Sequence, residues 1–543
     1  MKKKHLIGLM SMALTASLAA GCAKDNNEGQ ASSSPSAKPS ASAAAEAPKG
    51  YNGADRLQIS EKPAKVTLFY PFSANGAPKG DMPVWKKAAE ITNVSMENVA
   101  NESITEEVQS FNAMLAAGKL PDIIQGQRTT LAPAVSDGAF IPLDELIEKY
   151  APNIKKFLED FPEARRAGMG TDGKLYTLTG TLGGEPGKTL PSMGYFIRKD
   201  WLDKLNLPVP TNFEQFEQTL YAFREKDPNG NNKKDEIPLF SRNSGLWSLL
   251  EIWGATNGWY IGPDDKIYHG KTSDQYKAAL TDLAKWYKDG IIDPEIYTRG
   301  AQARQFMLGN NIGGATIDWF TSTAAVNDTV RAQVPDINFV AIAPPANKQG
   351  VVQMMAGREP IHSYAWGISR DAADPEMVIK YMDFFFTKEG ERLTNFGIEG
   401  EHYDLVNGEP VLRDVALKYE TGLPNFLRSI GGGYEIGRRG SLVGELSSMN
   451  EIAKAGFNMY AESDWIKPPF PVLTFTAEER KAIDDALVNL NPYMDEYEQK
   501  VFMGAQDINA TWDAYLAELN KLNLQSAVDA YNSAYARYKA ESK

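Results

Sequence analysis

The alternation of short apolar runs with amphipathic stretches near the start of the chain most constrains its fold. Residues 65–71 (KVTLFYP) and 94–99 (VSMENV) have strand character, and residues 84–91 and 104–119 place apolar side chains at helical spacing. A third short apolar run follows at 121–124 (PDII). Strands that alternate with helices in this way predict an α/β fold.

The third run ends in a polar tip, Gln125-Gly126-Gln127-Arg128. In open α/β sheets, ligands bind beyond the carboxyl ends of the strands. We therefore predict Gln125, Gln127 and Arg128 as ligand contacts, with a solvated turn as the alternative interpretation.

The length and composition bound the possible functions. A chain of 543 residues is long enough for two or three domains or lobes. Its net charge of −13 repels phosphate backbones and argues against nucleic-acid binding. Cys22 is the single cysteine, so an intrachain disulfide, a cysteine-based zinc site and Cys–His catalysis are not expected.

The N-terminal residues have the pattern of an export signal. Residues 1–21 combine three lysines with an apolar run that is too short to span a bilayer comfortably, and Cys22 follows small residues. The segment resembles a lipobox, in which Cys22 becomes the lipidated first residue, although Ala19 stands where that motif usually has leucine. The alternative is an ordinary secretory signal. Residues 22–62, rich in Ala, Ser and Pro up to residue 50, are expected to form a flexible tether.

A capped helix followed by an Asp/Asn-rich loop is the sharpest local signal. Thr211 with Glu214 predicts a capping box, and the four apolar residues Phe213, Phe216, Leu220 and Phe223 predict a buried helical face. The loop at 227–236 then has the oxygen spacing of a calcium loop, with side chains at positions 1, 3, 5 and 9 and a carbonyl at position 7: Asp227, Asn229, Asn231, Asp235 and Lys233.

Two residues of this loop depart from the calcium-loop pattern. Asn232 replaces the usual glycine and Pro238 replaces the usual glutamate, but Glu236 offers a carboxylate directly after Asp235. We predict a structural calcium site; the alternative is a polar turn rich in Asx residues.

Several stretches carry a family resemblance, which extends over about residues 65–538. They include residues 198–238 (RKDWLDKLNLPVPTNFEQFEQTLYAFREKDPNGNNKKDEIP), residues 397–404 (GIEGEHYD) and the closing stretch 512–538. The chain resembles the family 1 type of extracellular solute-binding lipoprotein that serves oligosaccharide ABC importers. It is similar to the large alginate-, glycosaminoglycan- and plant-oligosaccharide-binding lipoproteins of Gram-positive bacteria.

The resemblance implies a periplasmic-binding-protein-like fold of two α/β lobes with crossover hinge segments and a helical C-terminus. Lobe 1 is expected to comprise residues 63–185 and 356–404, and lobe 2 residues 186–355 and 405–543. An oligosaccharide would bind between the lobes and pass to a membrane permease that is powered by a separate ATPase. The protein is expected to be a monomer, lipid-anchored on the outer face of a Gram-positive cell membrane.

The resemblance also suggests ligand contacts. In this superfamily a strand that ends in tryptophan commonly stacks sugar, which points to Trp319 after residues 313–318; Trp259 and Trp253 are further candidates because aromatic faces suit the apolar faces of sugars. Polar candidates in the later part of the chain are Arg358, His362, Glu399 and His402. An uronate ligand would need a cation, for which Arg128, Arg198 and Arg358 are the candidates.

Two other classes of function remain open at this point. A polysaccharide-degrading enzyme, a glycoside hydrolase or a lyase, would need placed catalytic groups such as the paired carboxylates of glycosidases, and no recognisable hydrolase motif carries such a pair. A lipid-anchored sensor would bind the same ligand without importing it. We expect a binding protein with no catalytic residues.

Overall fold

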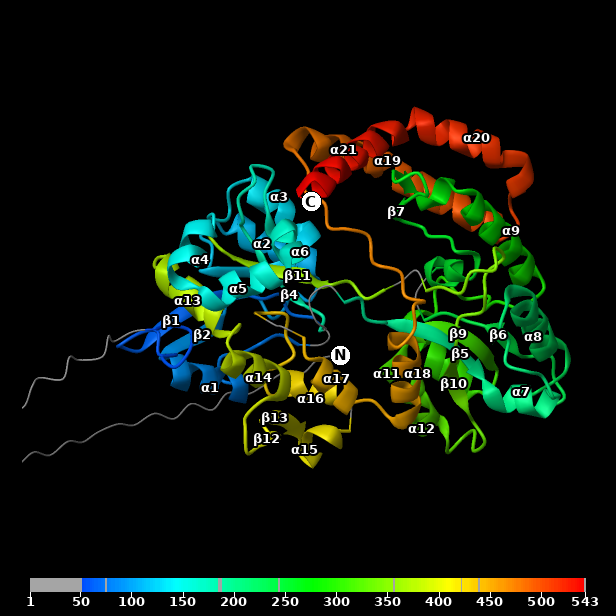
Figure 1. The fold of residues 1–543 in the computed structure, drawn as a ribbon, viewed down its shortest axis with the longest axis horizontal. Coiled ribbons are helices and arrows are strands. Elements are labelled where there is room, and N and C mark those ends of the chain that lie inside the picture. The colour runs from blue at the N-terminus through cyan, green and yellow to red at the C-terminus, as the bar shows by residue number, and fades with distance from the viewer. Residues whose placement is uncertain are drawn as a thin grey trace, which may run out of the picture. The chain divides into compact units, whose positions relative to one another are not determined.

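The computed structural model describes residues 51–73, 76–183, 188–242, 245–354, 357–420, 422–437 and 440–541. The predicted export signal, Cys22 and most of the predicted tether lie outside these residues. Within them, no helix is both long enough and apolar enough to cross a membrane. Two separate sheets organise the described chain, each with its own hydrophobic core (Figure 1).

The first sheet has five strands in the order β2 (Val94–Asn98), β1 (Ala64–Phe69), β3 (Ile123–Gln127), β11 (Ile361–Ile368) and β4 (Leu178–Thr181). Strands β2, β1 and β3 are parallel, and β11 runs antiparallel to both of its neighbours. The helices that pack with this sheet are α1 (Pro83–Thr92), α2 (Glu107–Ala116), α3 (Arg128–Ser136), α4 (Asp144–Tyr150), α5 (Pro152–Asp160), α6 (Pro162–Gly168), α13 (Pro375–Phe384), α14 (Lys388–Phe396), α15 (Asp414–Leu417) and α16 (Leu423–Ser429).

The second sheet has four strands in the order β10 (Phe339–Ile342), β5 (Met193–Arg198), β9 (Gly313–Trp319) and β6 (Ile237–Leu239). Strand β5 runs antiparallel to β9 and β10, and β6 is parallel to β9. The helical segments that accompany this sheet are α7 (Lys199–Leu205), α8 (Phe213–Glu225), η1 (Trp247–Trp253), η2 (Gly270–Thr272), α9 (Asp274–Lys288), η3 (Gly300–Gln302), α10 (Ala303–Gly309), α11 (Phe320–Ala324), α12 (Val326–Val330) and α18 (Glu451–Ala461). Helix α17 (Leu442–Ser447) touches both cores: Leu442 and Leu446 pack on the second, and Gly444 lies against Phe396 of the first.

The predicted α/β, two-lobe fold is confirmed, but the cores divide the chain differently from the expected boundaries. Leu412, Phe426 and Ile436 are buried with the first sheet, although residues from 405 onward were assigned to the second lobe. Their apolar side chains follow the hairpin of β12 (Tyr403–Val406) and β13 (Glu409–Leu412) into that core. At the other end, residues 51–62 are not all tether, because Tyr51 packs on the first core and its hydroxyl donates to Asp383 at 2.6 Å.

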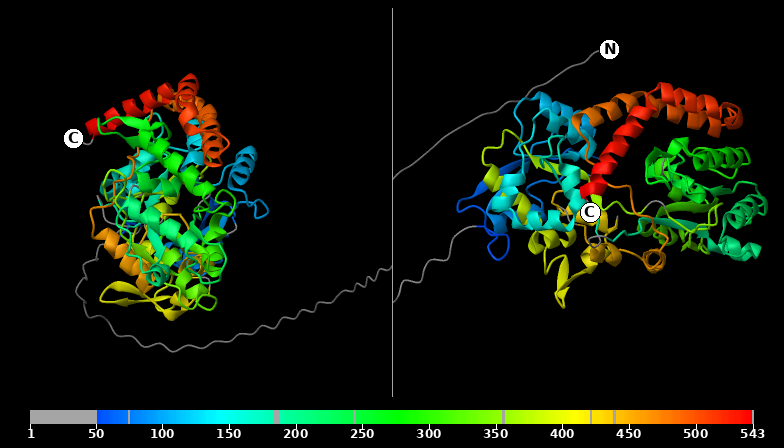
Figure 2. Two further views of the ribbon diagram at one scale, coloured as in Figure 1. Left: turned by 90° about the vertical axis from the view of Figure 1, so that its right-hand side faces the viewer. Right: turned by 45° about the horizontal axis from the view of Figure 1, so that its top comes forward.

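Three C-terminal helices complete the second core: α19 (Ala477–Phe502), α20 (Ile508–Lys521) and α21 (Leu524–Glu541). They lie beside α9 and the hairpin of β7 (Trp259–Ile261) and β8 (Ile267–His269), as the orange and red helices of Figure 2 show. The end of α21 also reaches the first lobe, where the guanidinium of Arg166 lies 4.9 Å from the ring centre of Tyr538.

The predicted apolar face of helix α8 is confirmed, and its cap is corrected. Phe213, Phe216, Leu220 and Phe223 are all buried. The N-cap is Asn212, not Thr211, and its side chain accepts a hydrogen bond from Gln215 N at 2.9 Å. Asn and Thr both cap helices well, so two adjacent capping residues made the start ambiguous by one position.

Candidate functional site

Trp319 closes strand β9 with an exposed aromatic side chain. The six preceding residues of the strand are buried, whereas Trp319 is 41% exposed. It pairs with Met193 at the start of β5, which puts it at the carboxyl edge of the second sheet. The buried carboxylate of Asp318 accepts a hydrogen bond from Trp319 N at 2.8 Å and so fixes the backbone at the strand end. The indole ring is thus available to solvent on a rigid support.

Two arginines converge on the carboxylate beside this ring. Arg242 Nε donates to Asp318 Oδ1 at 2.7 Å, and Arg304 Nη1 lies 3.3 Å from Asp318 Oδ2. Burial lowers the pKa of Arg304, and the Asp318 carboxylate partly opposes that shift. The sequence reading missed both arginines, although Arg242 follows the carboxyl end of β6, where the strand-end rule would have found it. Two cations that share one buried anion leave a net positive charge next to Trp319.

The carboxyl edge of the first sheet presents a hydrogen-bonded polar group around Gln127. Gln127 N donates to Glu107 Oε1 at 3.0 Å, and Gln127 Nε2 donates to the hydroxyl of Tyr364 at 3.3 Å. That hydroxyl donates in turn to Glu107 Oε2 at 3.0 Å. Gln127 is exposed, so the group is open to a ligand. Burial foremost, together with the Glu107 carboxylate, raises the pKa of Tyr364 and keeps its hydroxyl protonated.

Other groups at this edge were also missed from sequence. The hydroxyl of Tyr70, just after β1, donates to Glu435, and a cavity of about 300 Å³ opens beside Phe72 and Asn98 at the ends of β1 and β2. Glu435 comes from a part of the chain far from β1 in sequence, so no local pattern pointed to it. The strand-end rule predicted the edge itself, but not these partners.

Two of the residues predicted at the tip of β3 are less accessible than Gln127. Gln125 is fully buried opposite Trp366 and has no side-chain hydrogen-bond partner among the described residues. Arg128 is half-buried near Glu359; burial lowers its pKa and raises that of Glu359, and each charge partly stabilises the other. Gln125 therefore lies in the core, whereas Arg128 stays at the edge.

Trp253 and Trp259 do not offer free faces. Trp253 is 1% exposed, its Nε1 donates to Asp282 at 2.8 Å, and its ring packs on Phe213 and Trp286. The ring of Trp259 stacks on Tyr531 with centroids 3.9 Å apart. Helices α9 and α21 thus cover the surfaces on which we expected sugar to stack.

The later polar candidates are mostly held by local structure. His402 is buried and its Nδ1 accepts a hydrogen bond from Ile398 N at 3.0 Å, while burial lowers its pKa. Glu399 is exposed in the same turn, and His362 Nδ1 accepts from Tyr364 N at 3.2 Å at the start of β11. Arg198 is 1% exposed and pairs with Asp200 at 2.6 Å, so it is not open to a ligand. Arg358 is buried in a network of its own, described below.

The predicted calcium loop curls around its own oxygen atoms. Asp227 accepts hydrogen bonds from the backbone N–H groups of Asn231 and Asn232, at 3.1 and 2.9 Å, and takes the left-handed conformation with φ 47°. The amide groups of Asn229 and Asn231 lie 3.0–3.2 Å from the Asp235 carboxylate. Side chains at the predicted ligand positions therefore converge on one small volume.

Glu236 supplies the observation that tests this loop for a cation. It is fully buried, and neither carboxylate oxygen has a hydrogen-bond partner among the described residues. Burial first, then the Asp235 and Asp227 carboxylates, raise its pKa. No described group of three His, Cys, Asp or Glu side chains forms a ready metal cluster, but calcium also takes amide and backbone oxygens. An orphaned buried carboxylate beside two others fits a calcium ion.

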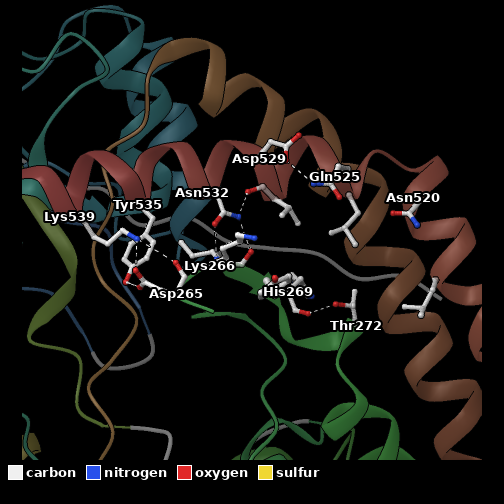
Figure 3. Close-up of a pocket in the computed structure, with 15 residues that line it drawn as sticks. Asp265, Lys266, His269, Thr272, Asn520, Gln525, Asp529, Asn532, Tyr535 and Lys539 are labelled. Atoms are coloured by element: carbon white, nitrogen blue, oxygen red, sulfur yellow. Dashed lines mark hydrogen bonds and ion pairs between the residues drawn. The ribbon is translucent and has the colours of Figure 1, made fainter. Parts of the chain in front are cut away.

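A cavity of about 710 Å³ lies elsewhere, between the β7–β8 hairpin and helices α20 and α21 (Figure 3). Of the predicted ligand contacts, none lines it. Several of its polar side chains are already paired: Asn532 bonds both backbone groups of Ile267, and Tyr535 and Lys539 bond Asp265. The cavity is a gap in the packing of the C-terminal helices rather than part of the two sheet edges.

Comparisons with known proteins agree with this arrangement. Residues 85–394 match the model of the bacterial extracellular solute-binding protein family. The chain is 24% identical over 465 residues to the fructooligosaccharide ABC transporter substrate-binding protein FusA of Streptococcus pneumoniae serotype 4, covering 79% of this chain and 82% of FusA. It is 24% identical over 312 residues to lipoprotein LipO of Bacillus subtilis, covering 55% of this chain and 59% of LipO.

Solved structures extend the match to nearly all described residues. The alginate-binding protein AlgQ2, solved without calcium ion, superposes with a TM-score of 0.78 at 33% identity, over 88% of this chain and 99% of AlgQ2. An EF-hand mutant of FusA, in complex with fructo-nystose, superposes with a TM-score of 0.69 at 20% identity, over 89% of this chain and all of that structure. FusA thus contains an EF-hand, and the AlgQ2 structure is a form without calcium. With its two sheets, its strand-end aromatic and a family match over more than half its length, the chain belongs to the bacterial extracellular solute-binding proteins.

Proposed function

We propose that this protein binds an extracellular oligosaccharide between its two lobes and delivers it to the permease of an ABC importer. The single observation that carries the proposal is Trp319, an exposed ring on a rigid strand end beside two arginines. Sugar rings lie flat on such a face, and closure of two lobes would remove the ring and the sugar from water together. No chemical step is required, and a separate ATPase would drive transport.

The charge at this edge favours a sugar that carries carboxylates. Arg242 and Arg304 share one buried carboxylate and leave a net positive charge next to the stacking ring. A guanidinium binds a carboxylate through charge-assisted hydrogen bonds, which are stronger than those to a neutral hydroxyl. AlgQ2, the 33% identical relative, is an alginate-binding protein. We infer that uronate oligosaccharides are the preferred class of ligand.

The first lobe would recognise the sugar hydroxyls. The exposed side chain of Gln127, oriented by Glu107 and Tyr364, offers both a donor and an acceptor, and Arg128 adds a positive charge nearby. Strands β4 and β5 support this pairing of edges, because the chain leaves the carboxyl edge of the first sheet at Thr181 and enters the second sheet beside Trp319 at Met193. Bound sugar would then touch both lobes.

We also propose that the loop 227–236 holds calcium as a structural ion. Asp227, Asn229, Asn231, Asp235 and Glu236 would supply side-chain oxygens, and Lys233 its backbone carbonyl. The buried, unpaired carboxylate of Glu236 supports this assignment. Calcium would offset most of the negative charge of the three carboxylates and stabilise the turn between α8 and β6. Its role would be to hold the lobe, since the loop lies outside both sheet edges.

The location of the protein follows from the same family. We propose that Cys22 is lipidated, that residues up to about 50 tether the lobes to the outer face of the cell membrane, and that the protein acts as a monomer. LipO, a relative, is a lipoprotein. Radiolabelled palmitate would be incorporated into the native chain and not into Cys22→Ser; equal incorporation would contradict the anchor.

The deciding experiment is titration calorimetry against matched panels of uronate and neutral oligosaccharides. Binding at one site per chain, tighter for the uronates, is expected. Product analysis at the same protein concentrations tests for the alternative enzyme, because release of shorter sugars at catalytic protein levels would contradict a transport function. Loss of uptake in cells lacking the protein would separate import from sensing.

A further inference from the structure

Among the described residues, three stretches of the chain that pass between the two cores lie close together. The first passage joins Thr181 of β4 to Met193 of β5, and the second joins Ile342 of β10 to Ile361 of β11. The third runs from Ile436, in the first core, to Leu442, which packs on the second. If the lobes open and close as rigid bodies, the change in backbone conformation falls on these passages.

One side chain joins the first two passages to the helix that follows the third. Arg358 lies in the second passage and is 8% exposed. Its Nη1 donates to the carbonyl of Leu182 at 2.9 Å and its Nη2 to the carbonyl of Pro191 at 3.2 Å, both in the first passage. The same two nitrogens donate to the Glu445 carboxylate, at 2.5 and 2.8 Å, on helix α17 directly after the third.

The backbones at this point are as tightly joined as the side chains. Arg358 N donates to the carbonyl of Leu190 at 2.8 Å, and Gly440 N donates to the carbonyl of Thr181 at 2.9 Å. A Cβ on Gly440 would lie 2.5 Å from Gly183 N, and one on Gly357 would lie 2.5 Å from the carbonyl oxygen of Lys467. Glycine is required at Gly440 because the first and third passages run almost in contact, and at Gly357 because the second passage runs against the backbone of Lys467.

We propose that the Arg358–Glu445 pair holds the hinge segments together and sets the equilibrium between lobe arrangements without touching the ligand. A two-pronged guanidinium–carboxylate pair whose guanidinium is buried has one favourable geometry, so it selects one arrangement of the three passages. The apparent affinity of a protein depends on the fraction of molecules in the binding-competent arrangement. Arg358, predicted from sequence as a ligand contact, is therefore a positioning residue. The effect on affinity rests on the proposed oligosaccharide binding; the effect on lobe arrangement does not.

The experiment measures lobe arrangement without sugar. Spin labels are placed at V415C on α15 and V488C on α19, which are 52% and 72% exposed, in the full chain carrying Cys22→Ser so that no native thiol reacts. Pulsed EPR then gives the distance distribution between the two lobes. Glu445→Gln keeps the shape of the side chain and removes its charge, and Arg358→Lys cannot make the four bonds. Both variants are expected to broaden the distribution.

Glu479→Gln is the matched control, because it breaks an arginine–carboxylate pair, with Arg537, inside the second lobe. It is expected to lower Tm and leave the distance distribution unchanged. In calorimetry, Glu445→Gln is expected to lower the affinity for every sugar by the same factor. The factor is about 3- to 10-fold if the fraction of binding-competent molecules falls by that amount.

Two results would overturn the proposal: a Glu445→Gln distribution that superimposes on the wild type, or a loss of affinity confined to acidic sugars, which would make Arg358 a ligand contact. If the wild type binds no oligosaccharide while the distribution still broadens, the hinge assignment stands and the proposed function fails. Circular dichroism confirms that each variant is folded before its distances are compared.

Discussion

The Asp/Asn loop at 227–236 and the edge at Trp319 lie in the same lobe and use polar groups in opposite ways. In the loop, the carboxylate of Asp227 accepts hydrogen bonds from the loop's own backbone N–H groups. The buried carboxylate of Glu236 has no hydrogen-bond partner among the described residues. At the edge, the carboxylate of Asp318 forms ion pairs with Arg242 and Arg304, and Trp319 is 41% exposed. The buried carboxylate of Glu236 needs a cation for the stability of the loop, whereas the exposed ring of Trp319 is free to bind a ligand.

Calcium is expected to have the largest effect, and on stability alone. At about 100 times its dissociation constant, an ion that binds only the folded state stabilises it by about 2.7 kcal/mol. Calorimetry should therefore show a higher Tm in calcium than in EDTA, with unchanged sugar affinity. Glu236→Gln should abolish the shift, and Glu225→Gln, a nearby exposed carboxylate paired with Lys234, should keep it. Equal Tm in both buffers would mean that the loop holds no structural calcium.

Trp319→Ala is expected to show the reverse pattern. Loss of the stacking surface should weaken oligosaccharide binding about 30-fold, or about 2 kcal/mol, in the range of a binding hot spot. Because the ring is exposed, Tm should stay within about a degree of the wild type. Trp247→Ala is the control, since Trp247 is 38% exposed in the same lobe. If both variants bind sugar like the wild type, the edge at Trp319 is not the site.

Arg242→Gln tests whether the positive charge beside Trp319 selects acidic oligosaccharides. Hydrogen bonds to charged groups contribute about 1.5–3 kcal/mol, so removing this cation should cost about tenfold for uronate oligosaccharides and little for neutral ones. Asp318 keeps Arg304 as an ion pair, which should preserve the fold. Arg331→Gln, which alters an exposed arginine of the same lobe, should leave both affinities unchanged. An equal loss for neutral and acidic sugars would argue against uronate selectivity.

Tyr364→Phe should have the smallest effect. It removes a hydroxyl that bonds Gln127 and Glu107 but leaves both side chains in place. The ligand is affected only through the orientation of its neutral hydrogen bond with Gln127, and such bonds contribute about 0.5–1.5 kcal/mol, so about a threefold loss of affinity is expected. Tyr176→Phe removes a hydroxyl that bonds Asp172 on the surface of the same lobe and should be silent. A tenfold or larger loss would mean that the first edge contributes as much as the charge at the second.

The sequence predicted those parts of the fold and site that depend on local order. The buried face of α8 follows from the spacing of its apolar residues, and Trp319 follows from the family resemblance, which marks a strand that ends in tryptophan. Gln125 was misjudged because β3 is buried on both faces, so the alternation that separates inward from outward residues is absent.

Residues whose role depends on contacts with distant parts of the chain could not be predicted from the sequence. The local sequence does not distinguish Trp253 from Trp319. In the fold, Trp253 is buried against α9, whereas Trp319 is 41% exposed. Glu435 reaches Tyr70, and Arg358 meets Leu182, Pro191 and Glu445, only after the chain has crossed between lobes. Such contacts are set by topology, which no local pattern records.

The position of β11 has a consequence for biosynthesis. This strand lies between β3 and β4, yet it is made only after the entire second sheet, and the first core also needs residues as late as Ile436. Pairings between distant segments form slowly because the intervening chain must first be ordered. The first lobe therefore cannot complete its sheet or its core until the whole second sheet has been synthesised.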